Sequence, residues 1–205
     1  MDYALRSHRA AARGVGAALS TLDEAAEALA RGGVVVIPTD TVYGLAARFD
    51  DATAVRRIYE LKGRPSDKAL QVLVPDEGWL DHLGAPSASA HVLAQRFWPG
   101  PLTIVVASGS ETIGLRVPAN EVTLELLKRT GPLAATSANQ SGRQTPGDIE
   151  SIRTLFGDGV DCYVDGGRID GTASTVVDTT RGGAEIVREG AISSVDIAAA
   201  LEKSI

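Results

Sequence analysis

The chain has 205 residues, of which 44% are hydrophobic and 22% are charged, and this is enough material for one domain with a substantial buried core. Its formal net charge of −6 argues against a protein that binds polyanions over its whole surface, although a local basic patch is compatible with it. The single cysteine, Cys162, excludes an intrachain disulfide and predicts a reducing, cytoplasmic location, and no apolar run approaches the ~20 residues of a membrane span.

The predicted elements alternate between helix and strand after a leading segment at residues 1–20. Helices are predicted at residues 21–33, 50–64, 87–98, 120–130 and from about 194 onward. Strands are predicted at residues 34–38, 70–74, 102–107, 112–118, 132–136, 160–167, 173–178 and 184–190. In the first helix, Thr21 and Glu24 match a capping box. Because the elements alternate and strands then crowd together, the pattern predicts a single α/β domain with a mixed sheet over residues 21–205.

Several common functional signatures are missing from the sequence. It contains no GxxxxGKS phosphate-binding loop, no GxGxxG after a strand and no GxSxG elbow, which argues against the usual nucleotide-binding and α/β-hydrolase sites. The three histidines, His8, His82 and His91, lack metal-ligand spacing and are interpreted as surface or structural residues. Cys162 lies in an apolar strand and is interpreted as a buried, inert thiol.

Polar loops at the ends of predicted strands are the strongest remaining signal. They read PTDTVYGL (38–45), KGRPSDKAL (62–70), TIGLRVP (112–118), ATSANQSGRQTP (135–146), GTASTVVD (171–178) and VREG (187–190). Ligands of α/β proteins bind beyond strand ends, where loops converge, so these segments are expected to line one cleft. Arginine pairs with carboxylate or phosphate through two parallel hydrogen bonds, which favours a substrate that carries both groups.

Each of these loops has a plainer interpretation when it is taken alone. Lys62 and Arg64 could be solvated charges at the end of a helix. Arg116 could protect an edge strand from aggregation. SANQSG could be an ordinary turn, and STVVD an ordinary strand. No single motif decides the function.

Taken together and in this order, the motifs resemble the YrdC-like family of L-threonylcarbamoyladenylate synthases over residues 21–190. The resemblance is carried by PTDTVYGLAA, KGRP, FWPGPLTIVV, LRVP, SANQSG and STVVD…VREG. A Lys-x-Arg pair followed by a Ser-x-Asn pair is specific in that order, here Lys62, Arg64, Ser137 and Asn139. The resemblance implies the short, single-domain form, with a twisted mixed sheet flanked by helices and a concave active-site cavity.

The same resemblance implies an activity and its partners. The family joins L-threonine, bicarbonate or CO2, and ATP into threonylcarbamoyl-AMP and pyrophosphate, which makes its members nucleotidyltransferases. The product feeds the threonylcarbamoyladenosine modification of tRNA through downstream transfer proteins. Mg²⁺ is expected as a cofactor that enters with the ATP phosphates, without a direct protein ligand.

The resemblance also assigns roles to individual residues. Those expected to act in catalysis are Lys62, Arg64, Ser137 and Asn139. Those expected to hold ATP are Lys62, Arg64, Lys68, Thr112, Ser137, Asn139, Thr145 and Arg188. Those expected to hold L-threonine are Thr41, Tyr43, Arg116, Ala135 and Ser174. Leu73 occupies the place where some relatives carry a histidine that touches threonine, so that contact is lost or replaced here.

Three alternatives stay open at this point. Members of the family are also associated with double-stranded RNA or tRNA, so the chain could be a binding module of the same fold without synthase activity. Its basic surface would consist of Arg56, Arg57, Lys62, Arg64, Lys68 and Arg143. The chain could instead resemble a carbamoyl-handling domain of hydrogenase maturation proteins, although those domains sit in larger chains with zinc-finger segments. A non-catalytic paralogue is the third alternative. The oligomeric state and a lid role for the segment from Ala191 are not predicted.

Overall fold

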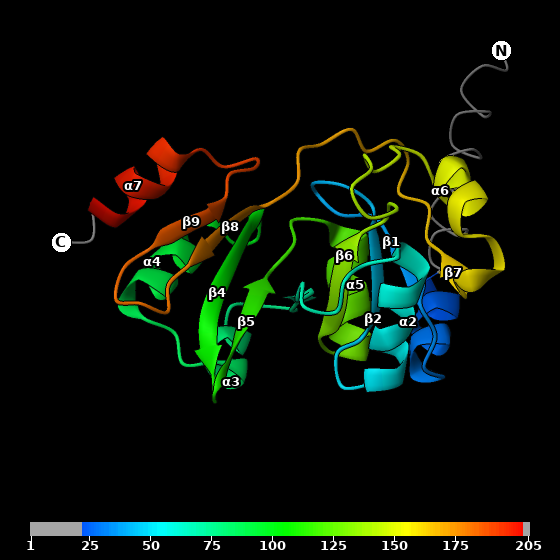
Figure 1. Ribbon diagram of the computed structural model, residues 1–205, viewed down its shortest axis with the longest axis horizontal. Coiled ribbons are helices and arrows are strands. Elements are labelled where there is room, and N and C mark those ends of the chain that lie inside the picture. Colours follow the sequence, from blue (N-terminus) through cyan, green and yellow to red (C-terminus); the bar gives the residue numbers. More distant parts are fainter. Residues whose placement is uncertain (1–21, 203–205) are drawn as a thin grey trace, which may run out of the picture.

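The computed structural model describes residues 22–202 (Figure 1). The strands are β1 (Val35–Ile37), β2 (Gly44–Arg48), β3 (Gln71–Leu73), β4 (Leu102–Ser108), β5 (Glu111–Arg116), β6 (Leu133–Ser137), β7 (Cys162–Tyr163), β8 (Thr175–Asp178) and β9 (Glu185–Arg188). A first helix at residues 22–30 is followed by α2 (Ala52–Lys62), α3 (Trp79–Leu83), α4 (Ala88–Phe97), α5 (Glu121–Thr130), α6 (Ile149–Phe156), the 3-10 turn η1 (Gly157–Gly159) and α7 (Ser194–Glu202). Among these helices, none is both long and apolar enough to cross a membrane.

The described strands form one mixed sheet of nine, in the order β7-β1-β2-β6-β3-β5-β4-β8-β9. The pairs β7–β1, β3–β5 and β4–β8 are parallel, and the remaining neighbours are antiparallel. The prediction of an α/β domain with a mixed sheet flanked by helices is therefore confirmed. The predicted boundary at residue 21 and the capping role of Thr21 lie outside the described residues.

One half of the sheet, formed by β7, β1, β2 and β6, has helices on both faces (Figure 1). Val35 and Ile37 of β1 pack with the first helix and α5 in one apolar cluster. Val34 and Val36 pack with α2 and α6 in another. A strand that is buried on both sides needs apolar residues at successive positions, which explains the continuous run VVVI.

The other half, formed by β5, β4, β8 and β9, packs one face against α3, α4 and α7 (Figure 1). Leu102, Ile104 and Val106 of β4 point into this apolar cluster. Thr103 and Val105, which alternate with them, line a cavity on the opposite face. The period of two along β4 thus separates core residues from cavity residues.

A bridging segment, residues 164–174, connects the two halves and runs across the molecule from β7 to β8 (Figure 1). It passes so close to the loop after β1 that a Cβ at Gly171 would lie 2.2 Å from the carbonyl oxygen of Thr41. The Tyr43 hydroxyl donates to the carbonyl oxygen of Gly167 at 2.7 Å and accepts from the amide of Gly166 at 2.9 Å. These contacts hold the bridging segment against the strand ends.

Four of the described elements were not predicted from the sequence: β2, α3, α6 and η1. The β2 sequence, GLAAR, has low β-propensity. It forms a strand because it lies between β1 and β6 and makes backbone hydrogen bonds to both. The signals for α6 were present, because Asp148 caps the helix through the amide of Ser151, and Ile149, Ile152 and Phe156 form its buried face.

Candidate active site

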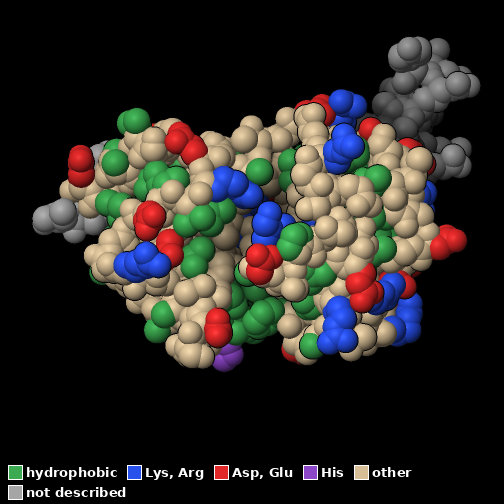
Figure 2. All heavy atoms as spheres, in the orientation of Figure 1, with side chains coloured by type: hydrophobic (Ala, Val, Ile, Leu, Met, Phe, Trp, Pro, Cys, Tyr) green, Lys and Arg blue, Asp and Glu red, His purple; other side chains and the backbone are tan. Residues whose placement is uncertain are grey.

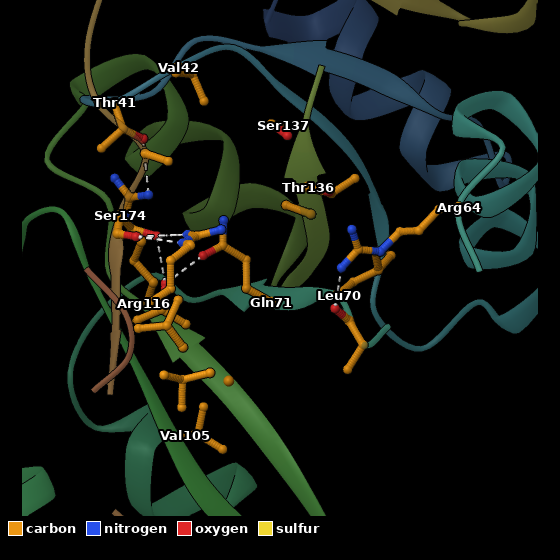
Figure 3. Close-up of a pocket in the computed structure, with 18 of the residues that line it drawn as sticks. Thr41, Val42, Arg64, Leu70, Gln71, Val105, Arg116, Thr136, Ser137 and Ser174 are labelled. Carbon is orange, nitrogen blue, oxygen red and sulfur yellow. Dashed lines mark hydrogen bonds between the residues drawn. The ribbon is translucent and has the colours of Figure 1, made fainter. Parts of the chain in front are cut away.

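A cavity of about 430 Å³ lies over the middle of the sheet, where its two halves meet (Figure 3). Its lining comes from strands β3, β4, β5, β6, β8 and β9, from the loop after β1 and from the segment after α2. Eight residues predicted from the motifs line it: Thr41, Arg64, Thr112, Arg116, Ala135, Ser137, Ser174 and Arg188. The polar loops thus converge as the sequence predicts.

A second hollow of about 320 Å³ adjoins the cavity and shares Val42, Ser137 and Ala173 with it. Asn139 and Thr145, two further predicted residues, line this hollow together with the loop after β6. The Ser-x-Asn turn therefore stands between the two spaces. The Ser137 hydroxyl donates to Asn139 Oδ1 and Asn139 Nδ2 donates to the Arg143 carbonyl oxygen, which leaves the second N–H of Asn139 Nδ2 for a ligand.

Arg116 is the most buried polar residue of the cavity, with 1% of its surface exposed. Its guanidinium donates from Nε to the Gly100 carbonyl at 3.0 Å, from one terminal nitrogen to Thr41 Oγ1 at 3.1 Å, and from the other to Asp40 Oδ1 at 2.6 Å. Burial lowers the pKa of Arg116, and the neighbouring Asp40 partly opposes this effect. A guanidinium has five N–H groups, so two are left for a ligand carboxylate. Because β5 lies between β3 and β4, the alternative that Arg116 protects an edge strand is wrong.

The polar cluster after β1 forms a tight turn that places Thr41 beside Arg116. Thr39 Oγ1 donates to the Val42 carbonyl at 2.7 Å and accepts from the Thr41 amide at 3.1 Å. The hydroxyls of Thr39 and Thr41 lie 3.0 Å apart. These local bonds explain why several polar residues follow a buried strand: some build the turn, and Thr41 and Asp40 hold the arginine.

Lys62 ends α2 but points inward, with 2% of its surface exposed. Its Nζ donates to the carbonyl oxygens of Ser137 and Asn139, at 2.5 and 2.8 Å, and to Asn139 Oδ1 at 2.9 Å. These bonds use all three donors of the ammonium group. Burial lowers the pKa of Lys62 to about 8, and the nearby Arg64 contributes in the same direction. The alternative of a solvated helix-end charge is wrong for Lys62, which braces the Ser-x-Asn turn from behind.

Arg64 and Arg188 both line the cavity, Arg64 from the segment after α2 and Arg188 from the end of β9. Arg64 is held by the carbonyl oxygens of Lys68 and Ala69, at 2.9 and 3.0 Å, and Arg188 donates to the Ser174 carbonyl at 2.7 Å. Burial and the charge of Arg64 both lower the pKa of Arg188. Figure 2 shows Lys and Arg side chains gathered where the two halves meet. Cations that repel one another around an open space are stabilised by an anionic ligand.

The model of the Sua5/YciO/YrdC family, described as telomere recombination, matches residues 27–190. The chain belongs to the Sua5/YciO/YrdC family. The threonylcarbamoyl-AMP synthase of Pyrococcus abyssi is 37% identical over 84% of this chain and 55% of its own length. The putative threonylcarbamoyl-AMP synthase of Mycobacterium tuberculosis (strain CDC 1551 / Oshkosh) is 38% identical over 85% of this chain and 86% of its own length.

A crystal structure of P. abyssi Sua5 complexed with L-threonine superimposes with a TM-score of 0.84 at 35% identity, covering 88% of this chain and 57% of that chain. The chain therefore spans little more than half the length of the P. abyssi protein and most of the length of the mycobacterial one. The predicted family and fold are confirmed.

Three residues that the family resemblance assigned to the site line neither hollow: Tyr43, Lys62 and Lys68. Tyr43 is fully buried and holds the bridging segment, and burial raises the pKa of its hydroxyl to about 12. Lys68 is exposed, and its carbonyl rather than its ammonium group contacts Arg64. These residues support the Sua5/YciO/YrdC site from behind or beside its walls.

The predicted basic surface for RNA is wrong for Lys62, because this side chain is buried. Arg57, a second member of that surface, is partly exposed and forms an ion pair with Asp161 at 3.1 Å, and it lines neither hollow. The six cations therefore do not form one concave patch. Of the histidines, His82 is exposed, His91 pairs with Asp81 at 3.4 Å, and His8 lies outside the described residues.

The part of the cavity lined by Arg64 and Ser137 can be compared with the needs of Mg²⁺ that arrives on a phosphate-bearing ligand. Within residues 22–202, no three His, Cys, Asp or Glu side chains gather as metal ligands. The neutral oxygen donors near Arg64 belong to Ser137 and, in the adjoining hollow, Thr145. Magnesium commonly binds through substrate phosphates and few protein groups, and this donor set fits that mode.

Three polar residues of the cavity were not assigned to the site from the sequence: Gln71 on β3, Thr103 on β4 and Thr136 on β6. Thr103 Oγ1 donates to Gln71 Oε1 at 2.7 Å and lies 3.0 Å from Ser174 Oγ. The signal for Gln71 and Thr103 in the sequence is a single polar residue inside each of the apolar strands LQVLV and LTIVVA. Leu73, by contrast, is fully buried in the apolar cluster under β1 and does not line the cavity.

Proposed function

We propose that this chain is an L-threonylcarbamoyladenylate synthase, a nucleotidyltransferase that uses L-threonine, bicarbonate and ATP. Its product would feed tRNA threonylcarbamoyladenosine modification in the cytoplasm through downstream transfer proteins. The observation that carries the proposal is the charge of the cavity. Arg64, Arg116 and Arg188 line it, and among the described residues no Asp or Glu does. Such a wall suits a ligand with a carboxylate at one end and phosphates at the other.

The amino-acid end of the site would be formed by Arg116 and Thr41. The two unused N–H groups of Arg116 would bind the threonine carboxylate, with Thr41 and Ser174 as nearby hydroxyl partners. A site whose buried polar groups pair with a substrate hydroxyl rejects analogues that lack it, because those groups are then left unpaired. The P. abyssi Sua5 structure contains L-threonine, which supports L-threonine as the ligand proposed for this chain.

The phosphate end would be formed by Arg64, Arg188 and the Ser-x-Asn turn. Arg64 and Arg188 would offset the charge on the phosphates, while Lys62 keeps Ser137 and Asn139 in place. Mg²⁺ bound through the ATP phosphates would supply further neutralisation of the pyrophosphate oxygens. The adjoining hollow at Thr145 gives room for the part of ATP that extends beyond the turn.

The chemistry needs two bonds to form. The threonine amine attacks the carbon of CO2, or of bicarbonate with loss of water, and the amine gives up a proton as the N–C bond of the carbamate forms. A carbamate oxygen then attacks the α-phosphorus of ATP, and the bond from this phosphorus to the β-phosphate oxygen breaks to release pyrophosphate. The protein contributes mainly by holding both reactants in line and by neutralising charge.

Pyrophosphate release tests the proposal directly. ATP, Mg²⁺ and bicarbonate would be supplied with threonine, serine, valine or alanine. Release is expected to need both bicarbonate and threonine, with serine a weaker substrate. Absence of release with every amino acid, together with tRNA binding that weakens steeply with salt, would replace the proposal by the RNA-binding alternative.

An Arg64→Ala variant sharpens this test. Turnover should fall far more than thermal stability, because the hydrogen bonds of this guanidinium lie at the exposed rim. Parallel losses of activity and stability would count against the assignment of Arg64 to the phosphates.

A further inference from the structure

Gln71 stands at the boundary between the two ends of the cavity (Figure 3). Along the chain it follows Lys68 and Ala69, whose carbonyl oxygens hold Arg64. Two residues further on, Leu73 pairs with Arg116 in the β3–β5 ladder. Its side chain therefore lies between the arginine assigned to phosphates and the arginine assigned to the threonine carboxylate. This is where the carbamoyl group would join the two substrates.

A directed chain of hydrogen bonds fixes the orientation of the Gln71 amide. Thr103 has one hydroxyl hydrogen and donates it to Gln71 Oε1 at 2.7 Å, so Ser174 Oγ must donate in their contact at 3.0 Å. Ser174 Oγ in turn accepts from Arg188 at 3.3 Å. With Thr103 as the donor to Gln71 Oε1, the hydrogen bonds follow one another from Arg188 through Ser174 and Thr103 to the Gln71 oxygen.

The end of this chain leaves a donor for a ligand. The hydroxyl hydrogens of Ser174 and Thr103 are both committed within the wall. The amide nitrogen of Gln71 carries two N–H groups, and within residues 22–202 no acceptor for them is found. Gly114, which pairs with Gln71 in the ladder, adds no side chain that could accept a hydrogen bond from the amide.

We propose that Gln71 is a substrate-binding residue that donates from Nε2 to an oxygen of bicarbonate and of the threonine carbamate. This inference rests on the synthase function proposed above. A carbamate has two equivalent oxygens, and only one attacks the α-phosphorus. A donor on the other oxygen, which becomes the carbonyl oxygen of the product, turns the attacking oxygen toward the phosphate end. The effect is one of binding and orientation, and no proton is transferred.

The test compares Gln71→Met with Gln95→Met, which makes the same change at an exposed position of α4 outside both hollows. Pyrophosphate release would be measured over a range of bicarbonate at saturating threonine and ATP. Loss of a hydrogen bond to a charged acceptor predicts a fall in kcat/KM for bicarbonate of about 10- to 100-fold in Gln71→Met. Gln95→Met should match the unaltered chain.

L-Threonine binding without ATP or bicarbonate, measured by calorimetry, separates this role from the amino-acid pocket. We expect the threonine Kd of Gln71→Met to stay within about twofold of that of the unaltered chain, because its carboxylate site on Arg116 is intact. A Thr103→Val variant, which removes the hydroxyl that orients Gln71, should lower the same bicarbonate parameter by a smaller factor. If Gln71→Met folds poorly, the bicarbonate kinetics of Thr103→Val still test the proposal.

The outcomes distinguish the two proposals. Unchanged bicarbonate kinetics in Gln71→Met overturn the role of Gln71 while leaving the synthase function in place. A loss confined to threonine affinity assigns Gln71 to the amino-acid pocket and overturns the carbamate assignment. Absence of release by the unaltered chain overturns both.

Discussion

The two halves of the sheet bury their strands in different ways, and this difference creates the site. In the half formed by β7, β1, β2 and β6, helices cover both faces and nearly every strand residue is core. In the half formed by β5, β4, β8 and β9, helices cover one face and the other borders the cavity. A sheet with helices on both faces of one half and on one face of the other provides both a rigid support and an accessible surface.

The two halves of the sheet also differ in where their strands can carry polar residues. Strands β1 and β2 are apolar at almost every position, whereas β4 alternates Thr103 and Val105 with buried aliphatic residues. A polar side chain on the open face can be satisfied by its neighbours or by a ligand. The polar side chains of the site therefore lie on the open face of one half of the sheet and on the loops beside it.

The ion pair at the junction of the halves should give the largest effect. Arg116→Met leaves the buried Asp40 carboxylate unpaired, and we expect the free energy of unfolding to fall by about 3–5 kcal/mol, with pyrophosphate release abolished. Chemical denaturation and the release assay would measure the two effects. In the control, Asp40→Leu combined with Arg116→Met should regain much of the stability but none of the activity. Equal instability of the single and double variants would contradict a role for the pair at this junction.

Substitutions at adjacent positions of β4 test whether the open half of the sheet is buried on one face only. Ile104→Ala should lower the free energy of unfolding by about 2–5 kcal/mol, because it leaves a void among α3, α4 and β4. Val105→Ala borders the cavity and should cost less than about 1 kcal/mol. In the covered half, Val35→Ala and Val36→Ala should cost similar amounts, since both side chains are fully buried. If Val35→Ala and Val36→Ala changed the free energy of unfolding by very different amounts, the conclusion that both faces of β1 are equally buried would be wrong.

Measurements of stability over a range of pH test the buried ammonium group of Lys62. Because the pKa of Lys62 falls from 10.5 to about 8 on folding, the unfolded chain binds more protons than the folded chain between these values. The free energy of unfolding should therefore rise with pH in this window, by up to about 1 kcal/mol per pH unit relative to Lys62→Met. Below pH 8 the two should run parallel. Parallel curves up to pH 10.5 would mean that Lys62 keeps an ordinary pKa.

The smallest effect is expected at the outer surface of the covered half. Arg129 on α5 pairs with Asp23 of the first helix at 2.6 Å and with Glu125 at 2.9 Å, in an exposed network. Arg129→Gln should cost less than about 1 kcal/mol, and 1 M salt should remove most of the difference. If the free energy of unfolding fell by several kcal/mol and the loss persisted in salt, the ion pairs of Arg129 would stabilise the packing of these helices more than the apolar cluster beneath them does.

Local patterns predicted the parts of the fold that local energetics determine. The β-branched run of β1, the alternation along β4 and the Gly-Pro ending of α5 are visible in short windows. The strand β2 was missed because GLAAR forms a strand through pairing with neighbours far away in sequence. No window of a few residues contains that information.

The site was predictable to the level of loops, but not to the level of side-chain direction. Motifs brought together Arg64, Arg116 and Ser174 correctly around one cavity. They did not reveal that Lys62 points inward to brace a turn, because a lysine after an amphipathic helix has no local feature that sets its direction. Gln71 was overlooked for the opposite reason, since a lone polar residue in a strand gains meaning only when the open face is known.

The pairing of β4 with β8 has a consequence for the synthesis of the protein. β4 ends at Ser108, whereas β8 begins at Thr175, so β4 emerges from the ribosome long before its outer partner. Until then its edge exposes free backbone donors and acceptors, which are a template for pairing with another nascent chain. The cavity is also incomplete until Arg188 has been translated. The nascent chain thus carries an unprotected strand edge while residues 109–174 are translated, and it loses this hazard in the same stretch that completes the cavity.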